Sequence, residues 1–425
     1  MFRLAILSYE GSEDEISAGD LGSSDRYKVQ AIECLIAADY TNPVAHTIEA
    51  LLLYAQAEWM GSQDATIDLS VIIGMIARLA MRMGIHRDSK AHPGITAFQG
   101  EMRRRVWAQV RLMDILYSFQ VSLPATVRPE ECDCELPRNI FDSEFEEDAV
   151  KLPPSRPLTE NTEVSYIIMK TRFMLVFGRI LSLTEYSSTI STEMVMKYER
   201  KLDEIRKDMP AHFQVPPPGE KTTTSLSLKK AQINLDRTYQ SAQCILHRKF
   251  LRRDSASMTY RRSCIDAAMT LLGHQATLFL ECDSLYPQNV KQRHLSTFTT
   301  HDFFIACMAV ALDLHYGFEA EPTSPSLQDI ALWGYDRRYE MITALETSTE
   351  FWRVSREDSA EAAKAYGMFS FVLAKVKKAQ QMTGEGFGRN PTTFDFGAIP
   401  IPLGETIGTK EAAWPLEFDL VRTRA

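Results

Sequence analysis

Apolar residues recur at helical spacing through most of this chain, and the clearest case is the segment 65–83. Its apolar positions fall three or four residues apart, which places them on one face of an α-helix. These positions are Ile72, Ile76, Leu79, Ala80 and Met83. Gly84 follows directly, and glycine in this place is typical of a helix C-cap. The pattern therefore predicts a helix that ends at Gly84.

The same periodicity predicts helices along the rest of the chain. In order, the predicted helices span 27–38, 44–59, 65–83, 98–119, 164–183, 192–207, 225–253, 260–282, 297–316, 327–348 and 360–382. No pair of alternating strands joined by an Asn-Gly or Asp-Gly turn occurs. We therefore predict an all-α fold, a large irregular multi-helix domain with a low-structure C-terminal tail.

Composition divides the chain into three parts. Residues 1–26 are predicted to be a flexible N-terminal lead-in, because Gly, Ser, Asp and Glu dominate 11–25. Residues 27–383 form the helical domain, with proline-rich loops near 124–157 and 209–224.

Residues 384–425 form an acidic-aromatic tail in which helical periodicity disappears. Apolar side chains alternate there with acids, and the candidate activation motif is Trp414, Leu416, Phe418 and Leu420. Such a segment could fold onto a coactivator groove, or its aromatics could pack back on the domain.

Charge and cysteine content restrict the class of protein. The formal net charge is −9 over 425 residues, which disfavours binding to nucleic acid by charge alone. Seven cysteines are scattered without a CxxC pair, so neither a zinc ribbon nor a disulfide framework is predicted, and a reducing compartment is expected. No apolar run is long enough to span a bilayer, so we expect no membrane partner.

No catalytic motif is present. GxSxG, GxxxxGK[ST], GxGxxG after a strand and HExxH are all missing, and no two of the nine histidines are three or four residues apart. We therefore predict no catalytic residue, no metal ligand and no cofactor. For Cys132-Asp133-Cys134, an acidic loop is favoured over a soft-metal site, because more ligands would be needed.

Two charged strings allow both a functional and a structural interpretation. His86-Arg87-Asp88 could be a catalytic pair, but no nucleophile is nearby; we favour a turn in which Asp88 caps the next segment and His86 packs. The side chains of Arg103-Arg104-Arg105 fan over roughly 200° of a helix, so they cannot form one flat patch for binding phosphate. One arginine is expected to be buried against Asp114 or an acid of the following loop, with the others solvated.

Five strings in order resemble a known family. They are AADYTNPVAHTIEALLLYAQAEWM (37–60), IARLAMRMGIHRD (76–88), EMRRRVWAQVRLMD (101–114), LPATVRPEECDCELPRNIFDSEF (123–145) and LHRKFLRR (246–253), followed by SCIDAAMTLL (263–272). They closely resemble the middle homology (regulatory) region of fungal transcription factors of the zinc binuclear-cluster class. The chain departs from that pattern at Ala108, where a second tryptophan is common, and at Lys249, where proline is usual.

The resemblance implies structural roles for the positions that match the family's strings. These positions are Gly84, His86, Arg87, Asp88, Glu101, Arg103, Arg104, Arg105, Trp107, Asp114, Leu136, Pro137, His247 and Arg248. The six-cysteine DNA-reading module that normally precedes this region is absent from the 425 residues. DNA contact is therefore expected only through an upstream module or through a partner.

The resemblance implies a nuclear, fungal-type transcriptional regulator, pathway-specific for a metabolic or secondary-metabolite gene cluster and not an enzyme. Expected partners are a related regulator, in a homodimer or heterodimer, and a small-molecule effector. Two alternatives stay open. The chain could be a relative repurposed as a small-molecule-binding protein or enzyme, with an open pocket lined by His86, Arg104 or Tyr117. It could also act only by dimerising with a full-length relative.

Overall fold

Helices make up all the regular secondary structure in the part of the chain that the computed structural model describes, which is 1–7, 18–62, 64–186, 190–217, 225–251, 258–285, 297–319 and 327–383. Within those ranges no strand occurs, and the all-α prediction is confirmed. The α-helices are α1 (Phe2–Leu7), α2 (Ala18–Ala37), α3 (Thr47–Met60), α4 (Ile67–Arg82), α5 (Ala97–Gln120), α6 (Ser165–Tyr186), α7 (Thr192–Lys207), α8 (Leu226–His247), α9 (Met258–Leu285), α11 (Thr297–Glu319), α12 (Leu327–Ser355) and α13 (Ala360–Thr383).

The end of α4 follows the predicted glycine cap. Gly84 has a positive φ of 69°, its N–H donates to the Met81 carbonyl at 2.9 Å, and the Ile85 N–H donates to the Ala80 carbonyl at 3.0 Å. This pair of hydrogen bonds is the Schellman arrangement, which satisfies carbonyls that a helix end leaves open. It turns the chain toward residues 86–91, which begin the site described below.

A capping box starts α5. The Thr96 hydroxyl accepts the Gln99 N–H at 3.2 Å, and the Gln99 side-chain oxygen accepts the Thr96 N–H at 3.2 Å. Two donors at the helix start are thereby satisfied. The cap fixes where α5 begins, and so which of its residues face the loop that follows the helix.

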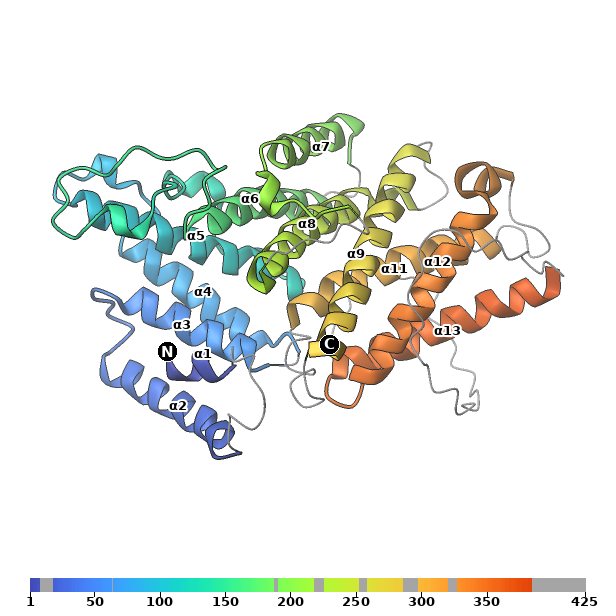
Figure 1. Ribbon diagram of the computed structural model, residues 1–425, viewed down its shortest axis with the longest axis horizontal. Coiled ribbons are helices and arrows are strands. Elements are labelled where there is room, and N and C mark those ends of the chain that lie inside the picture. Colours follow the sequence, from blue (N-terminus) through green and yellow to red (C-terminus); the bar gives the residue numbers. More distant parts are fainter. Residues whose placement is uncertain are drawn as a thin grey trace.

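Two hydrophobic clusters form the core. The first draws its residues from α3 through α8, and the second from α8 through α13. Helix α8 contributes to both, with Leu235 and Ala242 in the first and Cys244 in the second. Figure 1 shows the same order in space, with α2–α5 at one end, α12 and α13 at the other, and α8 and α9 between them.

Several segments differ from the sequence-based expectations. The lead-in expected over 1–26 contains α1 and the start of α2, and the helix expected to reach residue 253 ends at His247 in a 3₁₀ turn, Arg248–Leu251. Helix α12 is broken at Gly334, whose φ of 66° and ψ of 178° are not helical. Residues 124–157 contain no α-helix, only short 3₁₀ turns at Pro129–Glu131 and Asp142–Glu144. The tail 384–425 lies outside the described residues.

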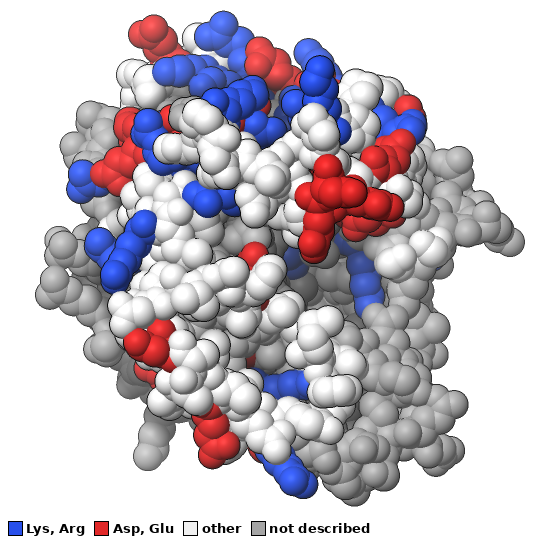
Figure 2. All heavy atoms as spheres, turned by 90° about the vertical axis from the view of Figure 1, so that its left-hand side faces the viewer, with Lys and Arg blue, Asp and Glu red and all other residues white. Residues whose placement is uncertain are grey.

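The surface near α2–α4 and the loop after α5 is only patchily charged. Figure 2 shows Lys and Arg interspersed with Asp and Glu along its upper part, and mostly uncharged atoms across its middle. Among the helices that the structure describes, none has both the length and the apolar character that a bilayer crossing requires.

Candidate functional site

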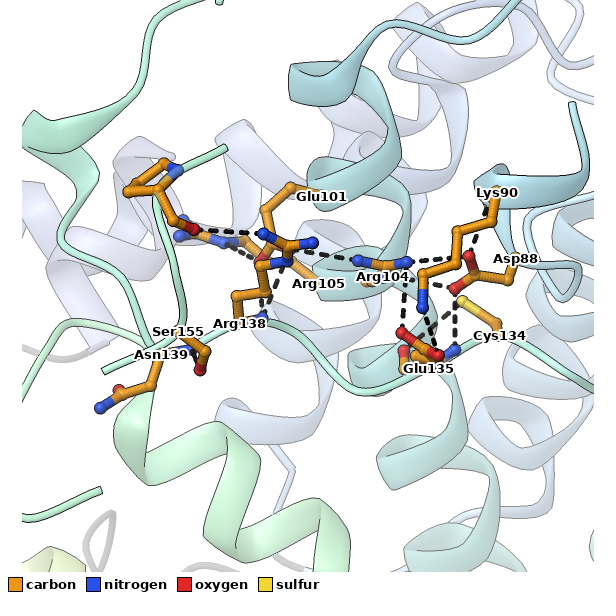
Figure 3. Close-up of polar contacts among 11 residues, drawn as sticks. Asp88, Lys90, Glu101, Arg104, Arg105, Cys134, Glu135, Arg138, Asn139 and Ser155 are labelled. Carbon is orange, nitrogen blue, oxygen red and sulfur yellow. Dashed lines mark hydrogen bonds and ion pairs between the residues drawn. The ribbon is translucent and has the colours of Figure 1, made fainter. Parts of the chain in front are cut away.

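Arg104 is the centre of a buried polar network where α5 meets residues 86–90 and 133–142 (Figure 3). Its Nε donates to Asp88 Oδ2 at 2.9 Å and its Nη2 to Asp88 Oδ1 at 2.8 Å. Its side chain is 4% exposed, and Glu135 lies 3.4 Å from the same Nη2. A two-point contact of this kind suits the planar guanidinium group and fixes its orientation.

Asp88 joins three segments through one carboxylate. Besides Arg104, it accepts the N–H of Lys90 at 3.0 Å, which caps the 3₁₀ turn Ser89–Ala91, and the N–H of Glu135 at 3.1 Å. Burial opposes ionisation, but these hydrogen bonds outweigh it and hold the pKa of Asp88 well below its ordinary value. Asp88 is therefore a permanent anion that ties the turn, α5 and the loop together.

Glu101 forms the second carboxylate of the network, one turn before Arg104. Its side chain is 0% exposed and accepts the backbone N–H of Arg138 at 3.1 Å and Arg105 Nε at 3.3 Å. Burial raises the pKa of Glu101, and the charge of Arg105 and the Arg138 N–H only partly oppose this effect. Glu101 thus holds the loop at Arg138 as Asp88 holds it at Glu135.

The three consecutive arginines point to three different partners. Arg104 is the buried one, and of the two expected kinds of partner it meets an acid of the loop, Glu135, and not Asp114; its main partner, Asp88, was not expected. Arg103 donates to the Met83 carbonyl at 2.9 Å, at the end of α4. Arg105 was expected to be solvated, but it is 15% exposed, pairs with Glu101 and with Asp142 at 2.6 Å, and lies over the Phe145 ring.

Asp114 has a separate role at the other end of the loop. Its two carboxylate oxygens accept the backbone N–H groups of Thr126 and Val127 at 3.0 and 2.9 Å. Asp114 cannot meet Arg104 because the two lie on the same helix about 15 Å apart along its axis. The chain reverses after α5, with Ser122 at a φ of 54°, and brings 126–127 beside Asp114. Asp114 therefore fixes the start of the loop, and Asp88 and Glu101 fix its middle.

Asn139 is a site residue that the sequence analysis missed. It is 2% exposed, and its Nδ2 donates to the carbonyls of Pro157 at 2.9 Å and Glu160 at 3.1 Å. Its Oδ1 accepts the Thr162 hydroxyl at 2.7 Å. The available signal was an asparagine two residues after Pro137 in a proline-rich loop, whose backbone has few hydrogen bonds of its own. Pro137 itself is buried, and Leu136 is partly buried.

The side chains expected around an open pocket do not face a common cavity. The His86 ring lies 6.0 Å from that of buried Trp107, and the His86 carbonyl accepts the N–H groups of Asp133 and Cys134. Burial lowers the pKa of His86. Tyr117 is buried with its ring against Trp59, and burial raises its pKa. Each of these side chains packs on a different protein partner.

The remaining family-string residues lie at the network's edge or far from it. Arg87 is at the edge, exposed and paired with Asp133 at 3.0 Å. His247 is buried at the end of α8, where its Nε2 meets Gln243 at 3.0 Å and Glu199 at 3.2 Å, and Arg248 begins the next turn. The motif Trp414, Leu416, Phe418 and Leu420 is outside the described residues.

The loop cysteines do not gather metal ligands. Cys132 Sγ lies 3.5 Å from the Arg128 carbonyl, and Cys134 Sγ lies 3.7 Å from the Glu135 carbonyl. Among the residues with a described position, no three His, Cys, Asp or Glu side chains are grouped as a metal site. The chemistry of this region is hydrogen bonding and ion pairing between protein groups.

Residues 8–207 match the fungal specific transcription factor domain, so this part of the chain belongs to that family. The chain is 36% identical over 365 residues to the Zn(2)-C6 fungal-type transcription factor mpsB of Macrophomina phaseolina, covering 84% of this chain and 49% of that protein. It is 32% identical over 358 residues to the Zn(2)-C6 fungal-type transcription factor pigI of Monascus ruber, covering 83% and 43%.

A further relative carries the name of a gene cluster. The equisetin cluster transcription factor eqxF of Fusarium heterosporum is 30% identical over 373 residues, covering 88% of this chain and 52% of that protein. The chain therefore spans about half the length of these relatives. No solved structure matches the chain.

Proposed function

We propose that this chain is the regulatory body of a pathway-specific fungal transcriptional regulator that acts in the nucleus on a secondary-metabolite gene cluster. The observation that carries the proposal is the alignment of 82–88% of the chain with several relatives named as transcription factors, among them the equisetin cluster factor. On this proposal the chain controls transcription and catalyses no reaction.

The polar network of Asp88, Glu101, Arg104, Arg105, Glu135 and Arg138 supports a role in transmitting conformational change. It ties a loop without α-helix to the long helix α5 by paired, buried charges. Buried pairs have few alternative arrangements, because breaking one leaves an uncompensated charge. An effector or a partner would act here through different affinities for two arrangements of the body. Homodimers or heterodimers with related regulators fit the same scheme.

Gene deletion with complementation tests this function. Deleting the gene is expected to lower or raise transcripts of one gene cluster, and a fluorescently tagged wild-type copy is expected in the nucleus and should restore them. An Asp88→Asn copy, which removes the negative charge paired with Arg104, is expected to lose normal regulation, and its tag reports how much of the protein accumulates in the nucleus. An unchanged transcriptome together with a tag that stays outside the nucleus would refute the proposal.

A further inference from the structure

Helix α4 packs against α3 and α5 and turns its remaining side outward. Its inward side is buried at Leu69, Ile73 and Ile76. On the opposite side, Ile67 is 67% exposed and Val71 is 65% exposed. Single exposed apolar side chains are ordinary on a protein surface, but these two lie one helical turn apart. The outward side of α4 therefore has an apolar part that the described residues leave uncovered.

The outer row of α4 adds charges at both ends of this apolar part. It consists of Asp68, Val71, Met75, Arg78 and Arg82, which recur at alternating spacings of three and four residues. This spacing places them along one seam, of the kind by which two helices pack. The three charged side chains are exposed, and none of them forms an ion pair with a described residue. The row thus presents an acid at its start, apolar side chains in its middle and two bases at its end.

The charge order of the outer row is self-complementary. Asp68 lies seven residues before Met75, and Arg82 lies seven residues after it. A two-fold axis at Met75 would bring a second α4 alongside in the antiparallel direction, with Asp68 of each copy level with Arg82 of the other. Parallel packing would instead set like charges against each other, which is unfavourable. The row therefore fits a second copy of itself in the antiparallel direction.

We propose that the outer row of α4 binds a second copy of this chain, antiparallel and with Met75 at the two-fold axis. Val71 would pack against the hydrocarbon part of Arg78 of the other copy, because long arginine stems cover apolar surface while their charge stays in water. A single helix of 16 residues presents less area than a standard interface, so a weak and reversible dimer is expected.

Analytical ultracentrifugation of the purified full chain tests the pairing. The chain is expected to pass from monomer to dimer between about 1 and 300 μM. Val71→Asp, which places a carboxylate in the seam, is expected to raise the Kd of the dimer at least about tenfold. The matched control is Val29→Asp, because Val29 is 54% exposed on α2, outside the row, and its Kd should equal that of wild type. A wild-type chain that stays monomeric, or equal effects of the two variants, would overturn the proposal.

A charge exchange tests the antiparallel direction. Asp68→Arg alone and Arg82→Asp alone should each dimerise more weakly than wild type, because like charges then face each other. Mixed in equal amounts, the two variants should form a heterodimer with the wild-type Kd, since each arginine again meets an aspartate. Asp68 and Arg82 also favour the ends of α4 through the helix dipole, but a loss of that kind would persist in the mixture. A mixture that dimerises no more strongly than either variant alone would refute the pairing.

A regulatory role for this dimer rests on the function proposed above, whereas self-association of the purified chain does not. Dimerisation is therefore tested independently of the gene-deletion result. A monomeric wild-type chain, together with a Val71→Asp copy that loses regulation of the gene cluster, would assign the row to a different protein and overturn the self-pairing.

Discussion

At the scale of single residues, the network around α5 depends on matching each buried cation to an anion. The Nε and Nη2 of Arg104 donate to the two carboxylate oxygens of Asp88, and Glu135 lies 3.4 Å from Nη2. Glu101 has Arg105 and the Arg138 N–H. Removing one member of such a pair is much more damaging than its net contribution suggests, because the other member stays buried and charged.

Replacing Arg104 should therefore be severely destabilising. Arg104→Met is expected to lower the free energy of unfolding by about 3–5 kcal/mol, since Asp88 loses its counter-charge in a buried place. Arg172→Met removes a more exposed pair with Asp208 and is expected to lose at most about 1 kcal/mol. Urea unfolding measures both. The double variant Arg104→Met/Asp88→Asn should recover part of the loss. Equal losses in Arg104→Met and Arg172→Met would show that the network contributes little to stability.

Lys170 is a buried cation of a different kind. Its Nζ donates to the Asn234 carbonyl at 3.2 Å and to the Thr238 hydroxyl, and no described carboxylate forms an ion pair with it. Burial lowers the pKa of Lys170 to about 7; the charge of Arg237 acts in the same direction and that of Asp302 opposes it. Lys170 is therefore partly neutral in the folded protein near pH 7.

This pKa predicts a pH dependence of stability. Between pH 7 and 10.5 the unfolded chain keeps the proton on Lys170 and the folded chain does not, so stability rises with pH in that window and the contribution is level below it. One proton corresponds to about 1.4 kcal/mol per pH unit. Lys170→Met should remove that slope and be most stabilising at pH 7. Urea unfolding across the window measures this slope. The control is Lys377→Met, which removes an exposed pair with Glu346. Parallel curves for Lys170→Met and wild type would show that Lys170 does not cause the slope.

At the scale of helices, the end of α4 sets the direction of the chain into the network. Gly84 adopts a φ of 69°, a conformation that a side chain disfavours because Cβ approaches the backbone. A Cβ at Gly84 would meet the Arg103 guanidinium at 3.5 Å, which is ordinary contact. The cost of a substitution there should therefore come from the backbone conformation.

Gly84→Ala is expected to reduce stability by about 1–2 kcal/mol through this strain. The matched control is Gly94→Ala in the loop before α5, where an added Cβ meets nothing within 4 Å and φ is not positive. That control should change stability by less than about 0.5 kcal/mol. Differential scanning calorimetry of the two variants decides between strain and a general effect of added bulk; similar Tm values for both would rule out strain.

The helices were predictable because their signals are local, whereas the site was predictable only in part. Apolar spacing and the Gly84 cap place α4 within two residues of the structure, but nothing local indicates the break at Gly334 in α12. The pairing of Arg104 with Asp88 depends on how the turn after α4 packs beside α5, which spacing does not encode. Asn139 was missed for the same reason, since its partners lie 16 to 23 residues further along the chain.

At the scale of the molecule, the two hydrophobic clusters are connected by more than α8. Asp64, in the turn between α3 and α4, caps α13 in the second cluster by accepting the Ala360 N–H at 3.0 Å and the Ser359 hydroxyl. A carboxylate at a helix start satisfies open donors and interacts favourably with the helix dipole. Residues almost 300 positions apart therefore meet at this cap, which links the two clusters directly.

Glu361 makes this link sensitive to pH. Burial, and then the charge of Asp64, raise the pKa of Glu361 to about 7 from an ordinary 4.5. Between these values the folded chain holds a proton that the unfolded chain has lost, so this group's contribution to stability is present at low pH and disappears as pH rises to 7. Glu361→Gln cannot ionise, so it should lack the decline and exceed wild type in stability above pH 7.

Urea unfolding at several pH values measures the effect, with Glu357→Gln as the control because it removes an exposed acid from the neighbouring turn. The control should follow the wild-type curve. If the cap is what joins the two clusters, Glu361→Gln should also sharpen the single unfolding transition above pH 7, because a neutral group beside Asp64 no longer repels it. A Glu361→Gln curve that declines as steeply as wild type between pH 4.5 and 7 would mean that the decline does not come from Glu361, and that its pKa is not raised in the folded chain.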